Sequence, residues 1–231
     1  MTAYLSCLAP QDIITSLALR GMRTVALPAF SALSCPVSSH ADMLLLDAGD
    51  CLFTYEGYTF AEKDALFGKF SKTVRLPDPT SSEYPHDVSL NIAVVGNNVF
   101  ANTKSASLVA LEHLTSLGKT IIHVNQGYAH CSVCVVNDNA LITADRGIAD
   151  AAQKNGLDVL LIESGHVTLP PYSYGFIGGA SGSDEENVYF CGSLSYHPNG
   201  EEIKKFCISH GKTPVELSDS PLCDVGGILI K

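Results

Sequence analysis

One phrase recurs five times along this chain, and it constrains the fold more than any single motif does. In each copy an amphipathic helical segment ends at a glycine, and a short strand-like run rich in β-branched residues follows at once. Glycine is the residue that closes helices in the left-handed conformation, and β-branched residues favour strands. The five glycines are Gly21, Gly68, Gly118, Gly156 and Gly211. The repeat predicts an α/β protein built from copies of one supersecondary unit.

A second feature precedes four of the five helices. It is a pair of apolar runs joined by a short turn rich in Gly, Asn, Asp and Ser, which is a strong local signal for a β-hairpin. The turns lie at residues 48–50, 96–98, 137–139 and 183–186. The repeated unit is therefore predicted to be strand–strand–helix–strand, or ββαβ.

The two ends of the chain supply the parts that a fifth unit needs. The N-terminal segment has a predicted helix at Gln11–Leu19 and a strand at Thr24–Ala26, with no hairpin before them. The segment Cys223–Ile230 is predicted as a strand with no helix after it. Joining these halves would leave no open edge strand. We therefore predict one domain over residues 1–231, a five-fold pseudosymmetric α/β propeller of ββαβ units, closed by N- and C-terminal halves of one unit.

The composition of the chain limits which partners the protein is expected to bind and where in the cell it is expected to lie. A net charge of -10 argues against nucleic acid and anionic membranes, and it is compatible with a small cationic ligand. No run approaches the roughly 18 apolar residues of a spanning helix, and the N-terminus does not resemble a signal peptide. The core is large enough to need no disulfides, so the eight cysteines are interpreted as reduced thiols of a cytoplasmic protein.

Five ββαβ units closed through the termini resemble the pentein fold of guanidino-modifying enzymes. That superfamily includes deiminases, dimethylarginine dimethylaminohydrolases, amidinotransferases and the non-catalytic ribosome anti-association factors. The resemblance implies a ligand on the pseudo-five-fold axis. It also implies an acidic residue that holds the guanidinium, and a Cys that attacks its carbon with help from a His.

Two positions match the family's binding residues in part. The segment Asp42–Asp47 resembles the acidic strand of the dimethylarginine hydrolases, which implies Asp47 as a ligand-binding carboxylate. The alternative is a solvated turn residue beside Gly49. Asn91 interrupts an apolar strand, and because a buried amide must find partners, we interpret it as lining a cavity.

The catalytic positions depart from the family pattern. Tyr128 stands where the deiminases keep their catalytic His, and His130 follows two positions later, which on a strand is the same face. An ordinary strand-start histidine is the simpler interpretation of His130. The family's nucleophilic Cys follows a Gly-Gly pair by about three residues, but here Ile230 occupies that place. Usual guanidino chemistry would then need a relocated nucleophile, either Cys131 or Cys223, with His130 as base.

Cys131 and Cys134 form a C-x-x-C pattern that suggests redox chemistry or a zinc site. The residues around them read as a strand, in which positions three apart face opposite sides, and no second pair completes four zinc ligands. We therefore expect structural cysteines, no metal and no cofactor.

Three functions remain open at the level of the sequence. The leading hypothesis is a protein that binds a small guanidino- or amidine-like ligand, without the usual hydrolysis, in an axial pocket lined by Asp47, Asn91, His130, Cys131 and Asp224. The first alternative is a C–N hydrolase or amidinotransferase that uses a relocated Cys. The second is a non-catalytic scaffold for a protein partner, whose axis would be filled.

Overall fold

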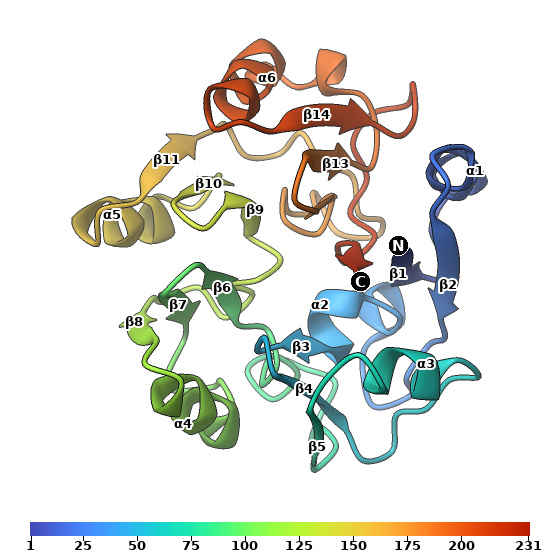
Figure 1. The fold of residues 1–231 in the computed structure, drawn as a ribbon, viewed down its shortest axis with the longest axis vertical. Coiled ribbons are helices and arrows are strands. Elements are labelled where there is room, and N and C mark those ends of the chain that lie inside the picture. Colours follow the sequence, from blue (N-terminus) through green and yellow to red (C-terminus); the bar gives the residue numbers. More distant parts are fainter.

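The computed structural model describes all residues from Met1 to Lys231 as a mixed α/β fold with five three-stranded sheets, none of them closed into a barrel. In every sheet the central strand pairs with one neighbour antiparallel and with the other parallel. Figure 1 shows the sheets around the centre of the molecule, with α1, α3, α4, α5 and α6 on the outside and the short α2 near the centre.

Four units follow one another along the chain in the predicted ββαβ order. The first comprises β3 (Leu46–Asp47), β4 (Cys51–Tyr55), α3 (Lys63–Phe67) and β5 (Lys72–Leu76). The second comprises β6 (Ala93–Val95), β7 (Asn98–Ala101), α4 (Leu108–Ser116) and β8 (Thr120–His123). The third comprises β9 (Val133–Asn137), β10 (Ala140–Thr143), α5 (Arg146–Lys154) and β11 (Asp158–Leu161). The fourth comprises β12 (Ser181–Ser183), β13 (Asn187–Phe190), α6 (Gly200–Ser209) and β14 (Thr213–Glu216).

The remaining sheet joins the two ends of the chain. It contains β1 (Thr2–Ser6), β2 (Arg23–Leu27) and the C-terminal β15 (Leu229–Ile230), and α1 (Gln11–Leu19) connects β1 to β2. β1 runs antiparallel to β15 and parallel to β2. The N- and C-terminal strands therefore share one sheet.

The structure corrects three local predictions. Residues Ala41–Leu44 form the helical turn α2, so only the end of the predicted strand Asp42–Asp47 is a strand. A short apolar run does not distinguish a buried helical turn from a strand. The C-terminal segment is a strand only at Leu229–Ile230, because two glycines with φ near +75° interrupt it. Cys131 lies in a turn before β9 rather than in a strand.

The repeated glycines mostly behave as expected. Gly21, Gly118, Gly156 and Gly211 have φ values between 75° and 81°, the left-handed region that closes a helix. Gly68 differs, because its φ of -65° keeps it in the right-handed helical region, with its N–H donating to the Asp64 carbonyl. The repeat thus marks the end of each outer helix even where the cap geometry changes.

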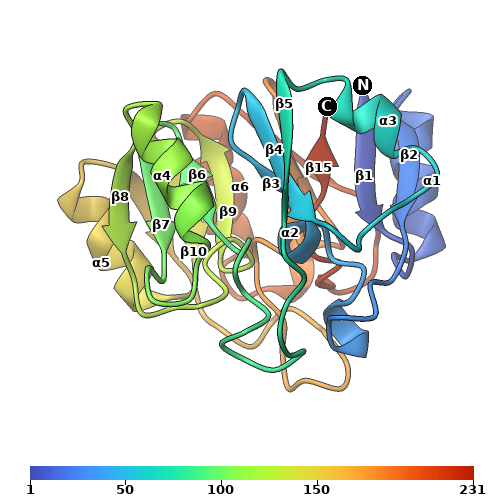
Figure 2. The same cartoon turned by 90° about the horizontal axis from the view of Figure 1, so that it is seen from below.

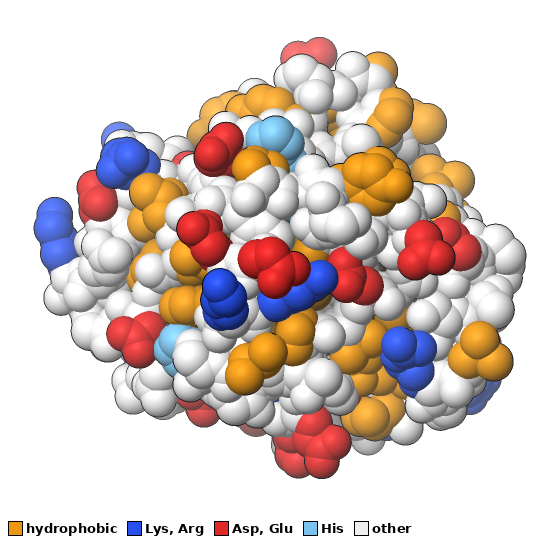
Figure 3. Space-filling model, turned by 90° about the horizontal axis from the view of Figure 1, so that it is seen from above, with side chains coloured by type: hydrophobic (Ala, Val, Ile, Leu, Met, Phe, Trp, Pro, Cys, Tyr) orange, Lys and Arg blue, Asp and Glu red, His pale blue; other side chains and the backbone are white.

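The long connections gather at one end of the molecule. In Figure 2 the loops around residues 80–90 and 165–175, together with the short 3-10 helix η1 (Cys35–Val37), lie below the sheets, while both termini lie at the opposite end. No helix is long and apolar enough to cross a membrane. On the face shown in Figure 3, acidic and basic side chains lie next to one another near the centre, and no large basic patch is seen. A pocket lined in part by Val37 of η1 and by residues 169–176 forms at this loop-bearing end.

Candidate functional site

A pocket of about 270 Å³ has aromatic walls and a buried polar floor. We call it the aromatic pocket. Its walls include Tyr128, Tyr172, Tyr174 and Phe176, and its floor includes His40, Cys131 and Asp224. Tyr172 and Tyr174 are exposed, whereas His40 and Asp224 are at most 7% exposed, so the aromatic rings form the rim and the polar groups lie deep. None of the lining residues is Lys or Arg.

The aromatic walls are held by contacts between neighbouring loops. The Tyr128 and Phe176 rings stack with centroids 6.1 Å apart, and Tyr174 meets Phe176 edge to face at 6.3 Å. The Tyr128 hydroxyl donates a 2.8 Å hydrogen bond to Asp87 Oδ2. Such a row of rings presents negative π-faces, which attract cations.

The floor brings together residues that are far apart in the sequence. His40 comes just before α2, Asp42 lies within it, and Asp224 comes from the segment before β15. The Asp42 N–H donates to the Gly226 carbonyl at 3.0 Å. A Cβ on Gly226 would lie 2.2 Å from the His40 Cβ, so this approach requires glycine.

The Asp224 carboxylate is fixed by the backbone. Its Oδ2 accepts a hydrogen bond from the Phe176 N–H and its Oδ1 accepts one from the Gly226 N–H, both at 2.9 Å. The His40 Nδ1 lies 3.7 Å from Asp224 Oδ1 and 4.0 Å from Asp42 Oδ1. We call His40, Asp42 and Asp224 the buried triad.

Burial dominates the electrostatics of the triad. It lowers the pKa of His40 to about 4, so the imidazole is neutral at pH 7. Burial and then the Asp224 charge raise the pKa of Asp42 well above its usual range. Burial also raises the pKa of Asp224, against the hydrogen bonds from Phe176 and Gly226. Because the imidazole beside them is neutral, the two acids have no cationic partner, and the site is favourable for a positive charge.

The Asn91 side chain holds the segment that carries Cys131 in place by hydrogen bonds. Its Oδ1 accepts hydrogen bonds from the backbone N–H groups of His130 at 2.7 Å and Cys131 at 3.2 Å. Its Nδ2 donates to the Asp42 carbonyl at 3.2 Å and to Cys131 Sγ at 3.0 Å. Asn91 is buried behind Cys131 and does not line the aromatic pocket.

The structure places two other predicted ligand-binding residues in a different cavity. Asp47 and His130 line a second cavity of about 170 Å³, which Asp42 also lines. Asp47 forms an ion pair with Lys231. Burial lowers the pKa of His130 to about 4, although Asp47 acts in the opposite direction. Cys131 and Asp224 line the aromatic pocket, so the residues predicted to share one axial pocket are divided between two cavities. The buried triad lies between these cavities.

The predicted catalytic candidates do not meet in one cavity either. Cys131 faces the aromatic pocket, whereas His130 faces the second cavity. The Cys223 Sγ donates to the Cys191 carbonyl at 3.3 Å, and burial raises its pKa to about 11. The histidine that shares a pocket with Cys131 is His40.

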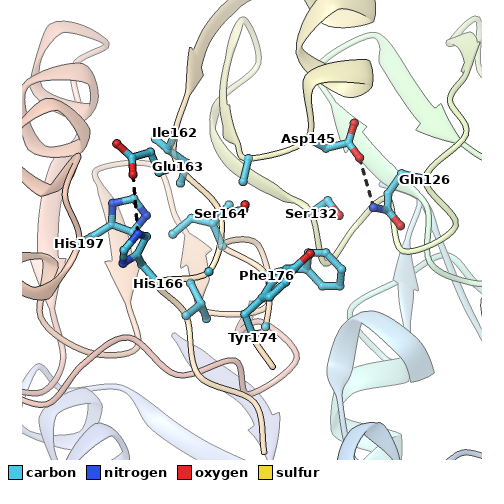
Figure 4. A pocket seen from close by; sticks show the side chains of 15 residues that line it. Gln126, Ser132, Asp145, Ile162, Glu163, Ser164, His166, Tyr174, Phe176 and His197 are labelled. Carbon is cyan, nitrogen blue, oxygen red and sulfur yellow. Dashed lines mark hydrogen bonds and ion pairs between the residues drawn. The ribbon is translucent and has the colours of Figure 1, made fainter. Parts of the chain in front are cut away.

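A third pocket, of about 160 Å³, shares Tyr174 and Phe176 with the aromatic pocket. Figure 4 shows His166 and His197 side by side in it, with their ring centroids 5.1 Å apart and Glu163 reaching toward His166. Across the pocket, Gln126 donates a 3.2 Å hydrogen bond to Asp145. His166 lies in a loop.

Comparison with solved structures defines the class of the fold, which is that of the penteins. The chain is similar to DDAH from Pseudomonas aeruginosa, a mutant complexed with citrulline, with a TM-score of 0.59 and 11% identity over 94% of this chain and 91% of that chain. It is similar to an amidinotransferase of the saxitoxin biosynthetic pathway from Microseira wollei, with a TM-score of 0.55 and 14% identity over 90% and 73% of the two chains. It is also similar to the agmatine deiminase of C. jejuni, with a TM-score of 0.55 and 10% identity over 94% and 86%. At these identities the likeness establishes the fold alone.

Within that class, the chain belongs to the family described as "Family of unknown function (DUF6873)", whose model matches residues 5–229. A search of curated proteins gave no match to the sequence. The solved structures of similar fold confirm the pentein fold that the sequence suggested.

Sequence reasoning missed His40, the place of Asp42 in the triad and the aromatic residues of the pocket. His40 and Asp42 form a His-x-Asp pair in the sequence, and that spacing was a signal that could have been noticed. The aromatic residues of 172–176 stand out as a dense run after Pro170-Pro171, but nothing local indicates that they meet Tyr128. Only the fold brings the two groups together.

Proposed function

We propose that this protein binds a small organic cation of the guanidino or amidine type in the aromatic pocket, without hydrolysing it. The observation that carries the proposal is the buried carboxyl of Asp224 on a floor beneath aromatic walls, with no Lys or Arg in the lining. A cation gains from the ring faces and from the carboxylate of Asp224 at once. The volume of about 270 Å³ suits a small ligand.

The state of Cys131 supports binding without nucleophilic attack. Burial raises the pKa of its thiol well above the usual range, and the charges of Asp42 and Asp224 add to the effect. A nucleophilic cysteine needs a depressed pKa, because the thiolate is the reactive form. His40, which shares the pocket with Cys131, is the observation that favours the alternative, a C–N hydrolase or amidinotransferase on a guanidino substrate.

The structures of similar fold are consistent with a small ligand. They include a DDAH mutant complexed with citrulline and an agmatine deiminase with substrate bound. We also propose that the five sheets constitute a five-fold pseudosymmetric propeller in one domain over residues 1–231. In such an arrangement the aromatic pocket and the second cavity would lie toward opposite ends of its axis.

The proposal is tested by thermal shift and calorimetry with agmatine, arginine and methylguanidine, in EDTA-treated buffer. Neutral ureas of the same shape serve as ligand controls. We expect the guanidino compounds to raise the Tm and the ureas to leave it unchanged, because a ligand that binds only the folded state stabilises it by mass action.

The matched variants are Phe176→Leu, which removes one aromatic wall, and Tyr196→Leu, which removes an exposed aromatic ring elsewhere. Loss of one cation–π contact is expected to weaken affinity about 5-fold in the first variant and not in the second. An equal response to cations and ureas, or no response to any of these compounds, would overturn the proposal.

A further inference from the structure

The buried triad combines a ring nitrogen and two carboxylates with no partner for most of their polar atoms. One ligand atom from each of His40, Asp42 and Asp224 lies within 4.8 Å of the others. Neither oxygen of Asp42 has a donor in good hydrogen-bonding geometry, although the Cys131 thiol lies close to this carboxyl, and the His40 Nδ1 has no partner either. All three residues are more than nine-tenths buried. Unpartnered polar atoms at this depth are costly in a folded protein.

The arrangement of these atoms is convergent and partly rigid. The His40 Nδ1 points between the two acids, at 3.7 Å from Asp224 Oδ1 and 4.0 Å from Asp42 Oδ1. Asp224 is held by two backbone N–H groups, and the Asp42 backbone is tied to Gly226. Backbone contacts of this kind orient the ligands of a metal site before the ion arrives.

We propose that His40, Asp42 and Asp224 form a binding site for a divalent transition-metal ion of the Zn²⁺ type. One imidazole nitrogen with two carboxylate oxygens is a donor set that such ions accept. With metal–ligand bonds of ordinary length, the ligand atoms of a tetrahedral zinc site lie about 3.3 Å apart. The two separations from His40, 3.7 and 4.0 Å, would have to shrink by about 0.4 and about 0.7 Å, and all three ligand atoms already lie within 4.8 Å of one another.

Three protein ligands leave one coordination position open. His40 and Asp224 line the aromatic pocket, so this position faces it. The inference goes beyond the proposed function, which needs no metal, and it differs from the expectation from the sequence that no metal binds. Because the ion and an organic cation would both draw on Asp224, they are expected to compete.

The test is a Co²⁺ titration followed by visible absorption, with Zn²⁺ displacement monitored by calorimetry. The protein carries Cys7→Ser and Cys35→Ser, which remove the two exposed thiols that would bind metal adventitiously. We expect one ion per chain, with ligand-field bands and no thiolate charge-transfer band in the near ultraviolet.

The decisive variant is Asp42→Asn, which removes one ligand and replaces an unpartnered carboxylate by a neutral amide of the same shape. We expect metal affinity to fall by at least about 100-fold while the Tm without metal is kept or raised. His40→Gln is the second variant, and it decides the question if Asp42→Asn does not fold. His166→Gln, in the third pocket, is the matched control and should bind metal as before.

Unchanged affinity in folded Asp42→Asn or His40→Gln, a thiolate band, or loss of binding in His166→Gln would overturn the inference. Its failure is separable from that of the proposed function. Phe176→Leu should retain metal binding while it weakens guanidino ligands, and guanidino binding is measured in EDTA. Addition of Zn²⁺ should lower the apparent affinity for agmatine in the parent protein and leave it unchanged in Asp42→Asn.

Discussion

At the scale of single residues, Cys131 shows how position and reactivity can separate. Its thiol lies at the floor of the aromatic pocket and accepts a hydrogen bond from the Asn91 side chain. Burial, followed by the nearby charges of Asp42 and Asp224, nevertheless raises its pKa. Proximity to a binding pocket therefore does not make this thiol a nucleophile.

This environment predicts the order in which the thiols react. Under limiting iodoacetamide near pH 7.5, the exposed Cys7 and Cys35 should be modified first. Cys131 should react at least about 10-fold more slowly, since each unit of raised pKa removes a factor of ten in thiolate. Peptide mass mapping gives the order, and the urea-unfolded protein, in which all eight thiols should react alike, is the control. Fastest modification of Cys131 would instead favour the enzymatic alternative.

At the scale of elements, the hairpin of β12 and β13 depends on one carboxylate in its turn. Asp184 Oδ1 accepts hydrogen bonds from the N–H groups of Glu186 at 2.9 Å and Asn187 at 2.7 Å, and its Oδ2 accepts one from the Tyr189 hydroxyl at 2.7 Å. Partial burial acts to raise the pKa of Asp184, but these hydrogen bonds outweigh it and lower the pKa. The ionised form therefore stabilises the hairpin.

Asp184→Ala should lower the free energy of unfolding by about 1 to 2 kcal/mol near pH 7. Because the pKa of Asp184 is lowered in the folded state, the stabilisation by its ionised carboxylate is complete above the ordinary pKa of 3.8. This stabilisation is lost as the pH falls through the pKa of the folded protein. Urea unfolding at a series of pH values should show that the difference in free energy of unfolding between the parent protein and Asp184→Ala becomes smaller in acid. Glu185→Ala, at the exposed neighbour, is the control. A gap that does not change with pH would contradict the role of the charge.

At the scale of the whole molecule, Asn91 connects three of the five units near the centre. It precedes β6, and its side chain bonds to the Asp42 carbonyl ahead of β3 and to the backbone of residues 130–131 ahead of β9. The hydrogen bonds of this one amide reach residues that are 39 to 49 positions away in the sequence. It joins segments that the sheets themselves do not connect, because each sheet is confined to one unit.

Asn91→Ala should therefore destabilise the protein by about 3 kcal/mol, since it leaves two buried N–H groups unpaired and opens a cavity. Chemical denaturation measures the loss. Asn125→Ala, at an exposed position, should change stability by less than about 0.5 kcal/mol. Equal effects of the two substitutions would show that the central amide does not link the units.

The sequence by itself determined the repeated unit, the outer helices and the hairpin turns. These follow from signals within about a dozen residues, such as the glycine after α5 and the turn at 137–139, so they can be read without the fold. The pairing of the two chain ends followed from the same local pattern. The N-terminal segment has a helix and a strand with no hairpin before them, and the C-terminal strand has no helix after it. The pentein resemblance rested on this architecture.

Only the tertiary structure decided which side chains meet at the centre. The triad joins residues 40–42 to residue 224, and no local pattern encodes that separation. The strand predicted at Asp42 is a helical turn, and this places Asp42 in the triad, whereas Asp47 and His130 line the second cavity. Local chemistry specifies elements, but the meeting of distant acids and aromatic rings depends on how the units pack, and that packing creates the candidate site.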